Sequence, residues 1–213
     1  MEENKVKLDI VSDVVCPWCV IGYKRLEKAI DQLNAWDRVD IEWQPFQLNP
    51  YIPPEGENLR EHLAKKYGTS TAESVHARDK LTALGAEVGF TFNYADDMRT
   101  YNTRDAHVML AYARQFDLQT PLKLALFSAF FTERQNVSDR TLLLDVAKQI
   151  GLPVEQGDAL FDDQTLIQEV DAQQAYWRSL GITGVPTVVL NREQAVSGAY
   201  PVDAYVKFLQ SAL

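Results

Sequence analysis

The 213-residue sequence contains only two cysteines, Cys16 and Cys19, so any thiol chemistry must take place at one point of the chain. It also lacks a long apolar run: the longest, around residues 122–131, is far short of the roughly 18 residues that span a bilayer. Basic residues are few, because 21 Lys and Arg stand against 30 Asp and Glu, a net charge of −9. Phosphate binding depends on clustered cations, so this charge argues against nucleic acids and anionic membranes as partners.

The first five residues contain no apolar stretch of the kind found in secretory signals. We therefore expect a cytoplasmic protein. Structural disulfides are uncommon in that reducing compartment, which favours a catalytic interpretation of the cysteines. The 46% apolar residues suffice for the core of one large domain or of a small domain that carries an insertion.

The beginning of the chain has a strand–helix–strand pattern. Residues 5–11 and 39–44 alternate apolar and polar side chains, the period-two pattern of strands. Between them, Leu26, Ile30 and Leu33 recur at the spacing of one helical face. A proline-rich stretch, residues 49–56, then interrupts the sheet.

From residue 57 to about residue 180 the periodicity is helical. Ser70 followed by Glu73 predicts a capping box, and Thr120 followed by Pro121 predicts another helix start. Trp36, Trp43 and Trp177 are expected in the core.

Strands return as a hairpin over residues 187–197, and Pro201 opens a last helix. We therefore predict an α/β fold. Residues 1–56 and 181–213 form one discontinuous sheet domain, and residues 57–180 form an all-helical insertion.

Cys16-Pro17-Trp18-Cys19 joins the first strand to the first helix. Proline suits the first helical position, which makes Cys16 the expected N-cap. Free backbone N–H groups and the helix dipole favour a negative sulfur there, so we expect Cys16 to be an acidic nucleophile. Cys19, three residues on and on the same face, would be the more buried, less acidic resolving thiol.

Two other interpretations of the cysteine pair remain open. A structural zinc site needs four ligands, and the remaining ones would have to come from the three histidines, His62, His76 and His107, which lack a recognised spacing. His62 and His76 are expected to face solvent. The pair could also belong to a non-enzymatic module that binds zinc or senses oxidation. A C-x-x-C pair that follows a strand and opens a helix favours redox chemistry, with no bound metal.

Gly184-Val185-Pro186-Thr187 precedes the returning strand, where a proline removes a ladder donor. A trans proline at a strand start is the ordinary alternative. Together with the cysteine pair, the motif favours a cis-Pro186, beside which the free backbone of Val185 would pair with an extended substrate.

These motifs resemble the DsbA-like branch of the thioredoxin superfamily, and the resemblance covers nearly the whole chain. Four segments are especially similar to cytoplasmic FrnE-type oxidoreductases: Asp13-Val14-Val15-Cys16-Pro17-Trp18-Cys19-Val20-Ile21-Gly22, Phe46-Gln47-Leu48-Asn49-Pro50, Asn102-Thr103-Arg104-Asp105-Ala106-His107 and Ser197-Gly198-Ala199. The resemblance implies a thioredoxin-like fold with a helical insertion and thiol–disulfide oxidoreductase activity. It also implies a redox-active Cys16–Cys19 disulfide and a cis-Pro186. Tyr200 departs from the pattern, since many relatives have glutamine after the alanine.

Related groups include the 2-hydroxychromene-2-carboxylate isomerases and kappa-class glutathione transferases, in which a serine typically stands where Cys16 does. A glutathione-dependent isomerase or transferase is therefore the second hypothesis. Because a thiolate at this position attacks a disulfide itself, the presence of both cysteines favours redox chemistry. No bound cofactor is expected, and glutathione is a candidate co-substrate.

The expected partner is a disulfide-containing protein, peptide or glutathione. A homodimer is one option for the oligomeric state. Pro17 and Trp18 would offer substrate a surface, although Trp18 would equally suit plain packing. Asn102 and His107 are further candidates for lining the cleft. Asp13 would either oppose thiolate formation at Cys16, or face solvent or accept a backbone N–H.

Overall fold

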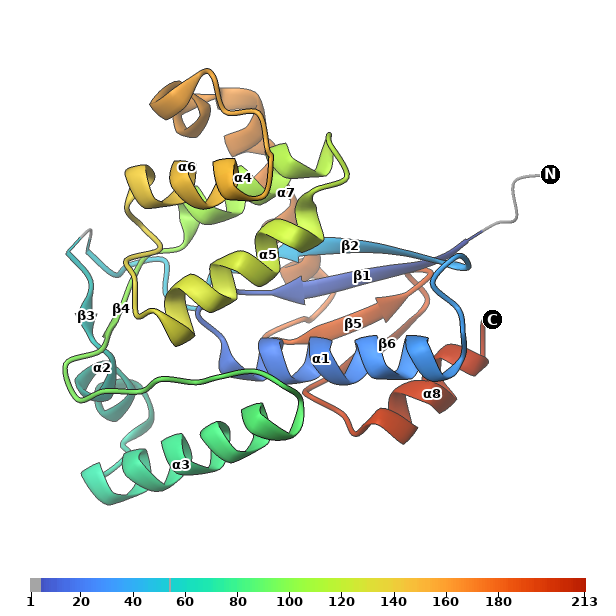
Figure 1. Cartoon of the computed structure of the whole chain (residues 1–213), viewed down its shortest axis with the longest axis horizontal. Coiled ribbons are helices and arrows are strands. Elements are labelled where there is room, and N and C mark those ends of the chain that lie inside the picture. The colour runs from blue at the N-terminus through green and yellow to red at the C-terminus, as the bar shows by residue number, and fades with distance from the viewer. Residues whose placement is uncertain (1–4, 54) are drawn as a thin grey trace.

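A computed structural model describes residues 5–53 and 55–213. Its main sheet has the strand order β2-β1-β5-β6 (Figure 1). The four strands are β1 (Val6–Ser12), β2 (Val39–Pro45), β5 (Thr187–Leu190) and β6 (Gln194–Ser197). β2 is parallel to β1, whereas β5 is antiparallel to β1 and β6 to β5. Both predicted strands and the predicted hairpin are therefore confirmed.

The strand register separates the two faces of the sheet. Ile10 lies between Trp43 and Val188 on one face, which packs against the first and last helices. On the other face, Asp9 lies between Glu42 and Val189, and polar side chains dominate. The alternation in the sequence therefore corresponds to one apolar face, which the first and last helices cover, and one polar face.

Helix α1 (Pro17–Gln32) runs beside α8 (Val202–Gln210) along the apolar face (Figure 1). Its buried side includes Tyr23, Leu26 and Ile30. Tyr23 meets Trp43 of β2 with ring centroids 4.8 Å apart, which ties the helix to the edge strand. Packing of this apolar helix face against the sheet holds the start of α1 next to the end of β1.

The segment between the two halves of the sheet is mostly helical. It contains α2 (Leu59–Tyr67), α3 (Thr71–Glu87), α4 (Arg104–Arg114), α5 (Gln119–Phe127), a π-helical turn η1 (Ser128–Thr132), α6 (Arg140–Gln149), a 3-10 helix η2 (Gly157–Asp162) and α7 (Gln164–Ser179). The capping box of α3 is present between Ser70 and Glu73. α4, α5 and α7 all contact β2, so the insertion packs on the sheet.

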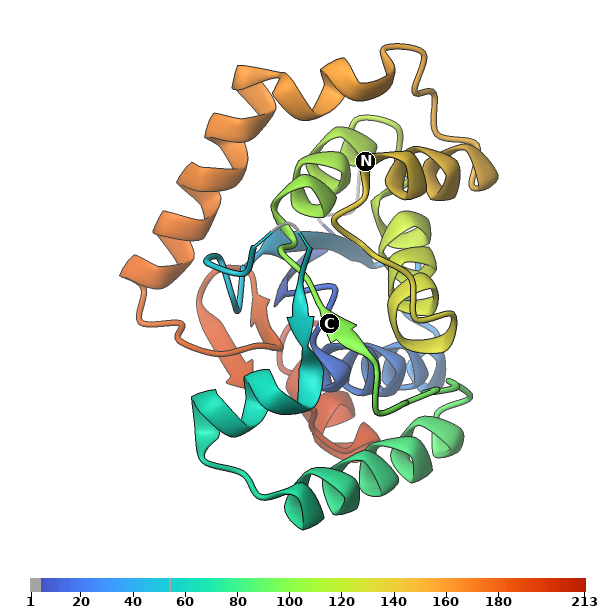
Figure 2. The ribbon, with the colours of Figure 1, turned by 90° about the vertical axis from the view of Figure 1, so that its left-hand side faces the viewer.

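The prediction of an all-helical insertion over residues 57–180 is wrong in one respect. β3 (Glu57–Asn58) and β4 (Arg99–Thr100) form a small antiparallel ladder. Figure 2 shows this ladder crossing in front of the end of the sheet where α1 begins. Strands of two residues are too short to give a period-two pattern, so the sequence carries no signal for them.

Two local predictions also fail. α5 begins at Gln119 with Leu118 as its N-cap, not at Pro121 with Thr120 as its N-cap. The reason is that the Gln119 amide bonds both the N–H (2.8 Å) and the C=O (3.0 Å) of Trp43 on the free edge of β2. The Thr120 hydroxyl accepts the Trp43 indole N–H at 2.9 Å instead of capping. Trp36 is 44% exposed, since its indole N–H bonds Asp31 at the end of α1. Trp43 and Trp177 are buried as predicted.

Candidate active site

Both cysteines lie at the start of α1. Cys16 is the N-cap in an extended conformation and Pro17 occupies the first turn, as predicted. The Cys19 N–H donates to the Cys16 carbonyl at 3.1 Å. Both residues are free thiols, with 4% of Cys16 and 1% of Cys19 exposed. Only Cys16 therefore offers a substrate part of its surface, and the neighbouring Trp18 is 39% exposed beside it.

The Val185–Pro186 loop meets the first cysteine. The Val185–Pro186 peptide bond is cis, as the sequence motifs predict. The Cys16 thiol donates to the Val185 carbonyl, with a sulfur–oxygen distance of 3.6 Å. The two motifs are separated by 169 residues in sequence but share one site.

Gly22 permits this close approach. A Cβ atom there would lie 3.0 Å from Pro186 Cγ and 3.5 Å from Ala199, so any side chain would push the loop away from α1. The Arg25 guanidinium donates to the Ala199 carbonyl at 2.9 Å, and the Gly198 N–H donates to the Pro186 carbonyl at 2.8 Å. The Gly-Ala motif therefore holds the proline loop from behind.

A buried carboxylate lies just before the cysteines. Asp13 has no exposed surface, and its Oδ2 accepts the Leu48 N–H at 2.8 Å. Its Oδ1 faces His107 Nε2 at 3.4 Å without the alignment of a hydrogen bond. Burial would raise the Asp13 pKa, but His107 and the Leu48 N–H outweigh burial and lower the pKa of this carboxyl. Of the alternatives left open, acceptance of a backbone N–H is correct and exposure to solvent is wrong.

His107 and Asn102 have different surroundings. His107 is 2% exposed, and burial lowers its pKa although Asp13 opposes that effect. Asn102 instead accepts from Gln47 Nε2 at 3.3 Å and donates to the Pro50 carbonyl at 2.9 Å. The structure thus brings His107 to the cysteines through Asp13, whereas Asn102 fixes the loop that follows β2.

The predicted order of acidity is wrong. The pKa of Cys16 is raised well above its usual range, by the neighbouring Cys19 thiol and by burial. Burial would also raise the pKa of Cys19, but the neighbouring Cys16 thiol and the charge of Lys123 lower it overall. The reduced pair thus favours a proton on Cys16 and negative charge on Cys19.

Two residues near the cysteines have no part in the predicted site. Lys123 on α5 is 1% exposed and lowers the pKa of Cys19 through its charge, and both cysteines in turn raise the pKa of Lys123. The sequence signal was a single lysine inside the longest apolar run. Tyr94 has a buried hydroxyl with no hydrogen-bond partner in the described part of the chain. Its pKa is raised by burial and by the charge of Cys16, and no sequence pattern marks it.

A groove of about 1070 Å³ opens beside the proline loop. Thr183, two residues before Val185, lines it, and Leu48 both lines it and packs on the same small core as Val185. The charged side chains along the groove are Glu57, Lys65, Lys66, Asp171 and Arg178. His62 also lines the groove and bonds Glu57 and Asn49, so the prediction that it faces solvent is wrong.

Metal ligands and membrane-crossing helices were also sought in residues 5–53 and 55–213. No three His, Cys, Asp or Glu side chains of this part gather in a way that could hold a metal ion. None of its helices combines the length and apolarity needed to cross a membrane.

Comparison with known proteins gives three informative matches. The family model of the DSBA-like thioredoxin domain matches residues 7–210. The uncharacterized protein YwbO of Bacillus subtilis is 26% identical over 204 residues, 95% of this chain and 94% of that protein. The crystal structure of a probable DsbA oxidoreductase from Streptomyces coelicolor is 30% identical with a TM-score of 0.91, covering 97% of this chain and 89% of that one.

A more distant structure shares the fold alone. The cytosolic disulfide reductase DsbM from Pseudomonas aeruginosa, solved with GSH, has a TM-score of 0.64 at 19% identity, over 96% of this chain and 98% of that one.

Proposed function

Because this chain belongs to the family of DsbA-like thioredoxin domains, we propose that it is a thiol–disulfide oxidoreductase in which Cys16 attacks and Cys19 resolves. The observation that carries this proposal is the placement of Cys16 Sγ 3.6 Å from the carbonyl beside cis-Pro186, with Cys19 one helical turn behind it. Exposure supports the division of roles, since Cys16 is the less buried thiol.

The reaction transfers two electrons. The proton on Cys16 first passes to the neighbouring Cys19 thiolate. The Cys16 thiolate then attacks one sulfur of the substrate disulfide and expels the other as a thiolate. Cys19 gives its proton to one substrate sulfur and attacks Cys16, which forms the Cys16–Cys19 disulfide and releases the second substrate sulfur. The substrate therefore leaves as one thiol and one thiolate. The substrate disulfide is reduced and the enzyme dithiol is oxidised; the reverse sequence oxidises a substrate dithiol.

The substrate segment would lie extended against the Val185 backbone and continue into the adjoining groove. Trp18 would cover the disulfide from the solvent side, because it is the large apolar side chain exposed next to Cys16. We also propose glutathione as a co-substrate and a cytoplasmic location. DsbM supports both, since it shares the fold, is described as cytosolic and was solved with GSH.

A trapping experiment tests the proposal. Cys19→Ala leaves Cys16 able to attack but removes the resolving thiol, so mixed disulfides with glutathione and with a disulfide-bonded peptide are expected to accumulate. Mass spectrometry under non-reducing conditions would detect them. Cys16→Ser is the matched control and is expected to trap nothing and to lose insulin reduction by at least about 10³-fold, because a hydroxyl does not attack disulfides.

Two outcomes would contradict the proposal. Full insulin reduction by Cys16→Ser would remove Cys16 from the nucleophile role. Tight glutathione binding together with turnover that survives Cys19→Ala would instead favour a glutathione-dependent isomerase or transferase.

A further inference from the structure

Lys123 is a buried cation contributed by the insertion. It lies on α5 with 1% of its surface exposed, and its ammonium is 5.2 Å from the ring centroids of both Trp43 and Phe127. Within residues 5–53 and 55–213, no carboxylate oxygen lies within 4.0 Å of it. Aromatic faces compensate only part of the cost of removing an ammonium from water, so the remaining stabilisation must come from charge farther away.

That charge comes from the site around the cysteines. Burial lowers the pKa of Lys123 to about 8, and the groups that oppose this effect are, in order, Cys19, Asp13 and Cys16. The interaction is mutual, because Lys123 is also among the causes that lower the pKa of Cys19. The largest opposing influence on this lysine is thus a redox-active sulfur, whose charge disappears when a disulfide forms.

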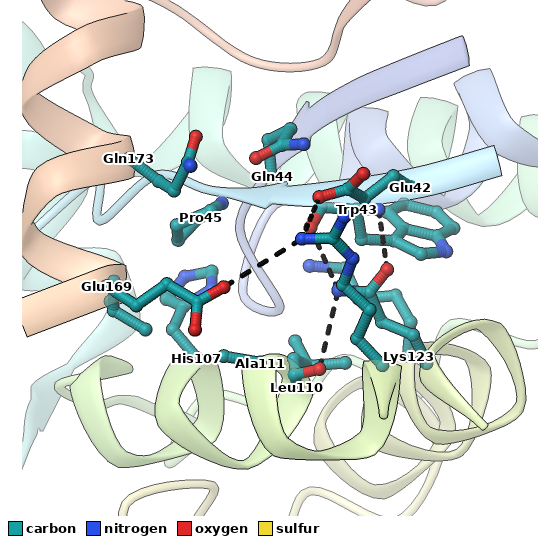
Figure 3. Close-up of a pocket in the computed structure, with 13 residues that line it drawn as sticks. Glu42, Trp43, Gln44, Pro45, His107, Leu110, Ala111, Lys123, Glu169 and Gln173 are labelled. Carbon is teal, nitrogen blue, oxygen red and sulfur yellow. Dashed lines mark hydrogen bonds and ion pairs between the residues drawn. The ribbon is translucent and has the colours of Figure 1, made fainter. Parts of the chain in front are cut away.

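A small cavity connects Lys123 to the polar face of the sheet. Its volume is about 20 Å³, enough for one water molecule, and it lies between β2, α4, α5 and α7 (Figure 3). Glu42 and Glu169 line it together with Lys123. Arg114, which is 48% exposed, pairs with Glu42 at 2.7 Å and reaches Glu169 at 3.8 Å. The cavity therefore places Lys123 on the same water-sized space as the partly exposed Arg114 and the carboxylates that Arg114 contacts.

We propose that Lys123 is the counter-charge of the reduced cysteine pair, and that its proton is exchanged with solvent through this cavity as the pair is oxidised and reduced. The inference rests on the proposed function and adds a residue that tunes the same site. Lys123 acts through Cys19 and touches no substrate, so it is a positioning residue.

The proton balance follows the electrons. Oxidation of the pair gives two electrons to the substrate disulfide, and the single proton of the pair leaves with one substrate sulfur while the other departs as a thiolate. Lys123 then faces Asp13 but no thiolate, so its ammonium is less stabilised and releases its proton toward the cavity. Reduction restores the thiolate, and the amine takes a proton back from solvent.

Other charged groups surround Lys123. The flanking elements β2, α4 and α7 contribute Glu42, His107, Arg114 and Glu169, and η1 carries no charged side chain. The charged side chains of α6 are Arg140, Asp145 and Lys148, all at least 35% exposed and paired with other residues. None of these groups changes charge when a disulfide forms between Cys16 and Cys19. Among the charged groups around Lys123, only the cysteine thiolate is lost on oxidation.

The test measures the redox equilibrium with glutathione in Lys123→Met, with Lys123→Gln as a second neutral variant should the first fail to fold. Without the ammonium, the reduced thiolate form loses stability, so the equilibrium constant for reducing the protein with glutathione falls about tenfold. That factor corresponds to a potential about 30 mV more reducing. In the wild type, reduction takes up an additional proton at pH values just below 8, and this extra pH dependence is expected to vanish in the variants.

Lys148→Met makes the same substitution at an exposed position of α6 and is expected to leave the equilibrium unchanged. Lys123→Arg keeps the charge and is expected to retain the equilibrium constant within about threefold. An equilibrium constant within twofold of the wild type in Lys123→Met, with unchanged pH dependence, would overturn the proposal.

A second readout separates this inference from the proposed function. Thiolate absorbance of the reduced protein reports ionisation of the pair without requiring turnover. The first thiol pKa is expected to rise in Lys123→Met. If the wild type exchanges disulfides normally and that titration does not move, the role of Lys123 is wrong while the oxidoreductase function stands. If the wild type exchanges no disulfide, the proposed function fails regardless of the lysine.

Discussion

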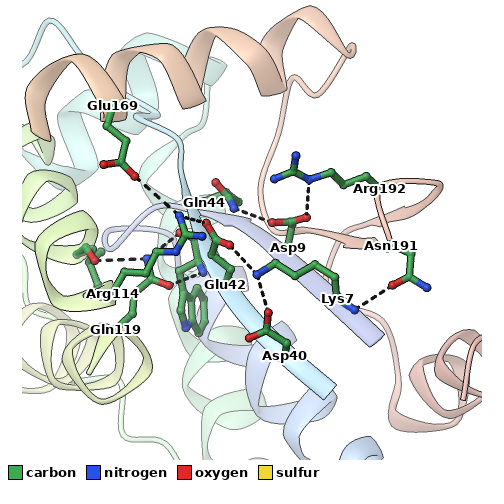
Figure 4. Close-up of polar contacts among 12 residues, drawn as sticks. Lys7, Asp9, Asp40, Glu42, Gln44, Arg114, Gln119, Glu169, Asn191 and Arg192 are labelled. Atoms are coloured by element: carbon green, nitrogen blue, oxygen red, sulfur yellow. Dashed lines mark hydrogen bonds and ion pairs between the residues drawn. The ribbon is translucent and has the colours of Figure 1, made fainter. Parts of the chain in front are cut away.

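Two clusters of buried polar side chains differ in how well their atoms are hydrogen-bonded. The sheet-face cluster consists of Asp9, Glu42, Gln44 and Trp177, all buried. Figure 4 shows Asp9, Glu42 and Gln44 on the polar face of the sheet. Gln44 donates to Asp9 at 2.6 Å and accepts the Trp177 indole N–H at 3.1 Å. Glu42 meets Lys7 at 2.6 Å and Arg114 at 2.7 Å.

The redox cluster, Cys16, Cys19, Asp13, His107 and Lys123, is as deeply buried but poorly paired. Asp13 Oδ1 and His107 Nε2 face each other at 3.4 Å, and neither atom has a hydrogen-bond partner in the described residues. Its lysine has rings, not a carboxylate, as nearest partners.

The difference separates a structural role from a chemical one. A fully paired buried cluster fixes an arrangement and leaves little free energy to gain by changing charge. A cluster with unpaired atoms lowers the stability of the fold. The pKa values of its groups, however, change readily when a proton or an electron pair moves nearby. Variants of the two clusters should therefore shift stability in opposite directions.

Gln44→Leu should have the largest effect on stability. It leaves the Asp9 carboxylate and the Trp177 indole N–H buried with one partner fewer each, at a cost of about 3 kcal/mol in the free energy of unfolding. Urea denaturation would measure this loss. Disulfide exchange per folded molecule should stay unchanged, and Gln194→Leu, the same change at an exposed position of β6, should cost less than about 0.5 kcal/mol. A tolerated Gln44→Leu would contradict the structural role of the sheet-face cluster.

Lys123→Met should act in the opposite direction. The lowered pKa of about 8 means that the folded state binds the proton of Lys123 less well than the unfolded chain does, so this lysine costs stability at neutral pH. Replacing it by an apolar side chain of similar length should raise the free energy of unfolding by about 2 kcal/mol. The gain should shrink as pH rises from 8 toward 10.5, where the unfolded chain also loses the proton. A lower free energy of unfolding in Lys123→Met would contradict this prediction and would mean that Lys123 stabilises the fold.

The acid side of the stability curve reports on Asp13 and His107. The folded-state pKa of each lies below its ordinary value, 6.5 for the imidazole and 3.8 for the carboxyl. The unfolded chain thus binds more protons, and stability is lost as pH falls below 6.5 and again below 3.8, by at most about 1.4 kcal/mol per pH unit for each proton. His107→Asn should flatten the first decline in a urea titration series, whereas His76→Asn, at an exposed histidine, should not.

The fold was largely predictable because its signals are local. The alternation in residues 5–11 and 39–44, the proline after Cys16 and the capping box at Ser70 each act within a few residues and each appear in the structure. The failures come from tertiary contacts. α5 begins at Gln119, two residues before the predicted start at Pro121, because Gln119 binds the main chain of Trp43, 76 residues away.

The site was predictable to the same extent. Cys16, Cys19 and Pro186 belong to short motifs, and the structure brings them together. The predicted order of acidity failed because the pKa of each thiol depends on the other thiol, and because the pKa of Cys19 also depends on Lys123, which lies on another helix. Asp13 and His107 lie 94 positions apart in sequence, so no spacing could pair them. Electrostatics at this site is a property of the fold, not of the motif.

Tyr94→Phe should have the smallest effect. The Tyr94 hydroxyl is buried without a partner in the described residues, so removing it breaks no hydrogen bond, and the free energy of unfolding should change by less than about 0.5 kcal/mol. Tyr205→Phe is the matched control, because the equally buried Tyr205 hydroxyl donates to the Gly198 carbonyl at 3.1 Å and its loss should cost about 1 kcal/mol. If both variants lose about 1 kcal/mol in the free energy of unfolding, the Tyr94 hydroxyl has a hydrogen-bond partner and resembles the paired groups of the sheet-face cluster. If only Tyr205→Phe loses stability, the Tyr94 hydroxyl is unpaired, like the polar atoms of the redox cluster.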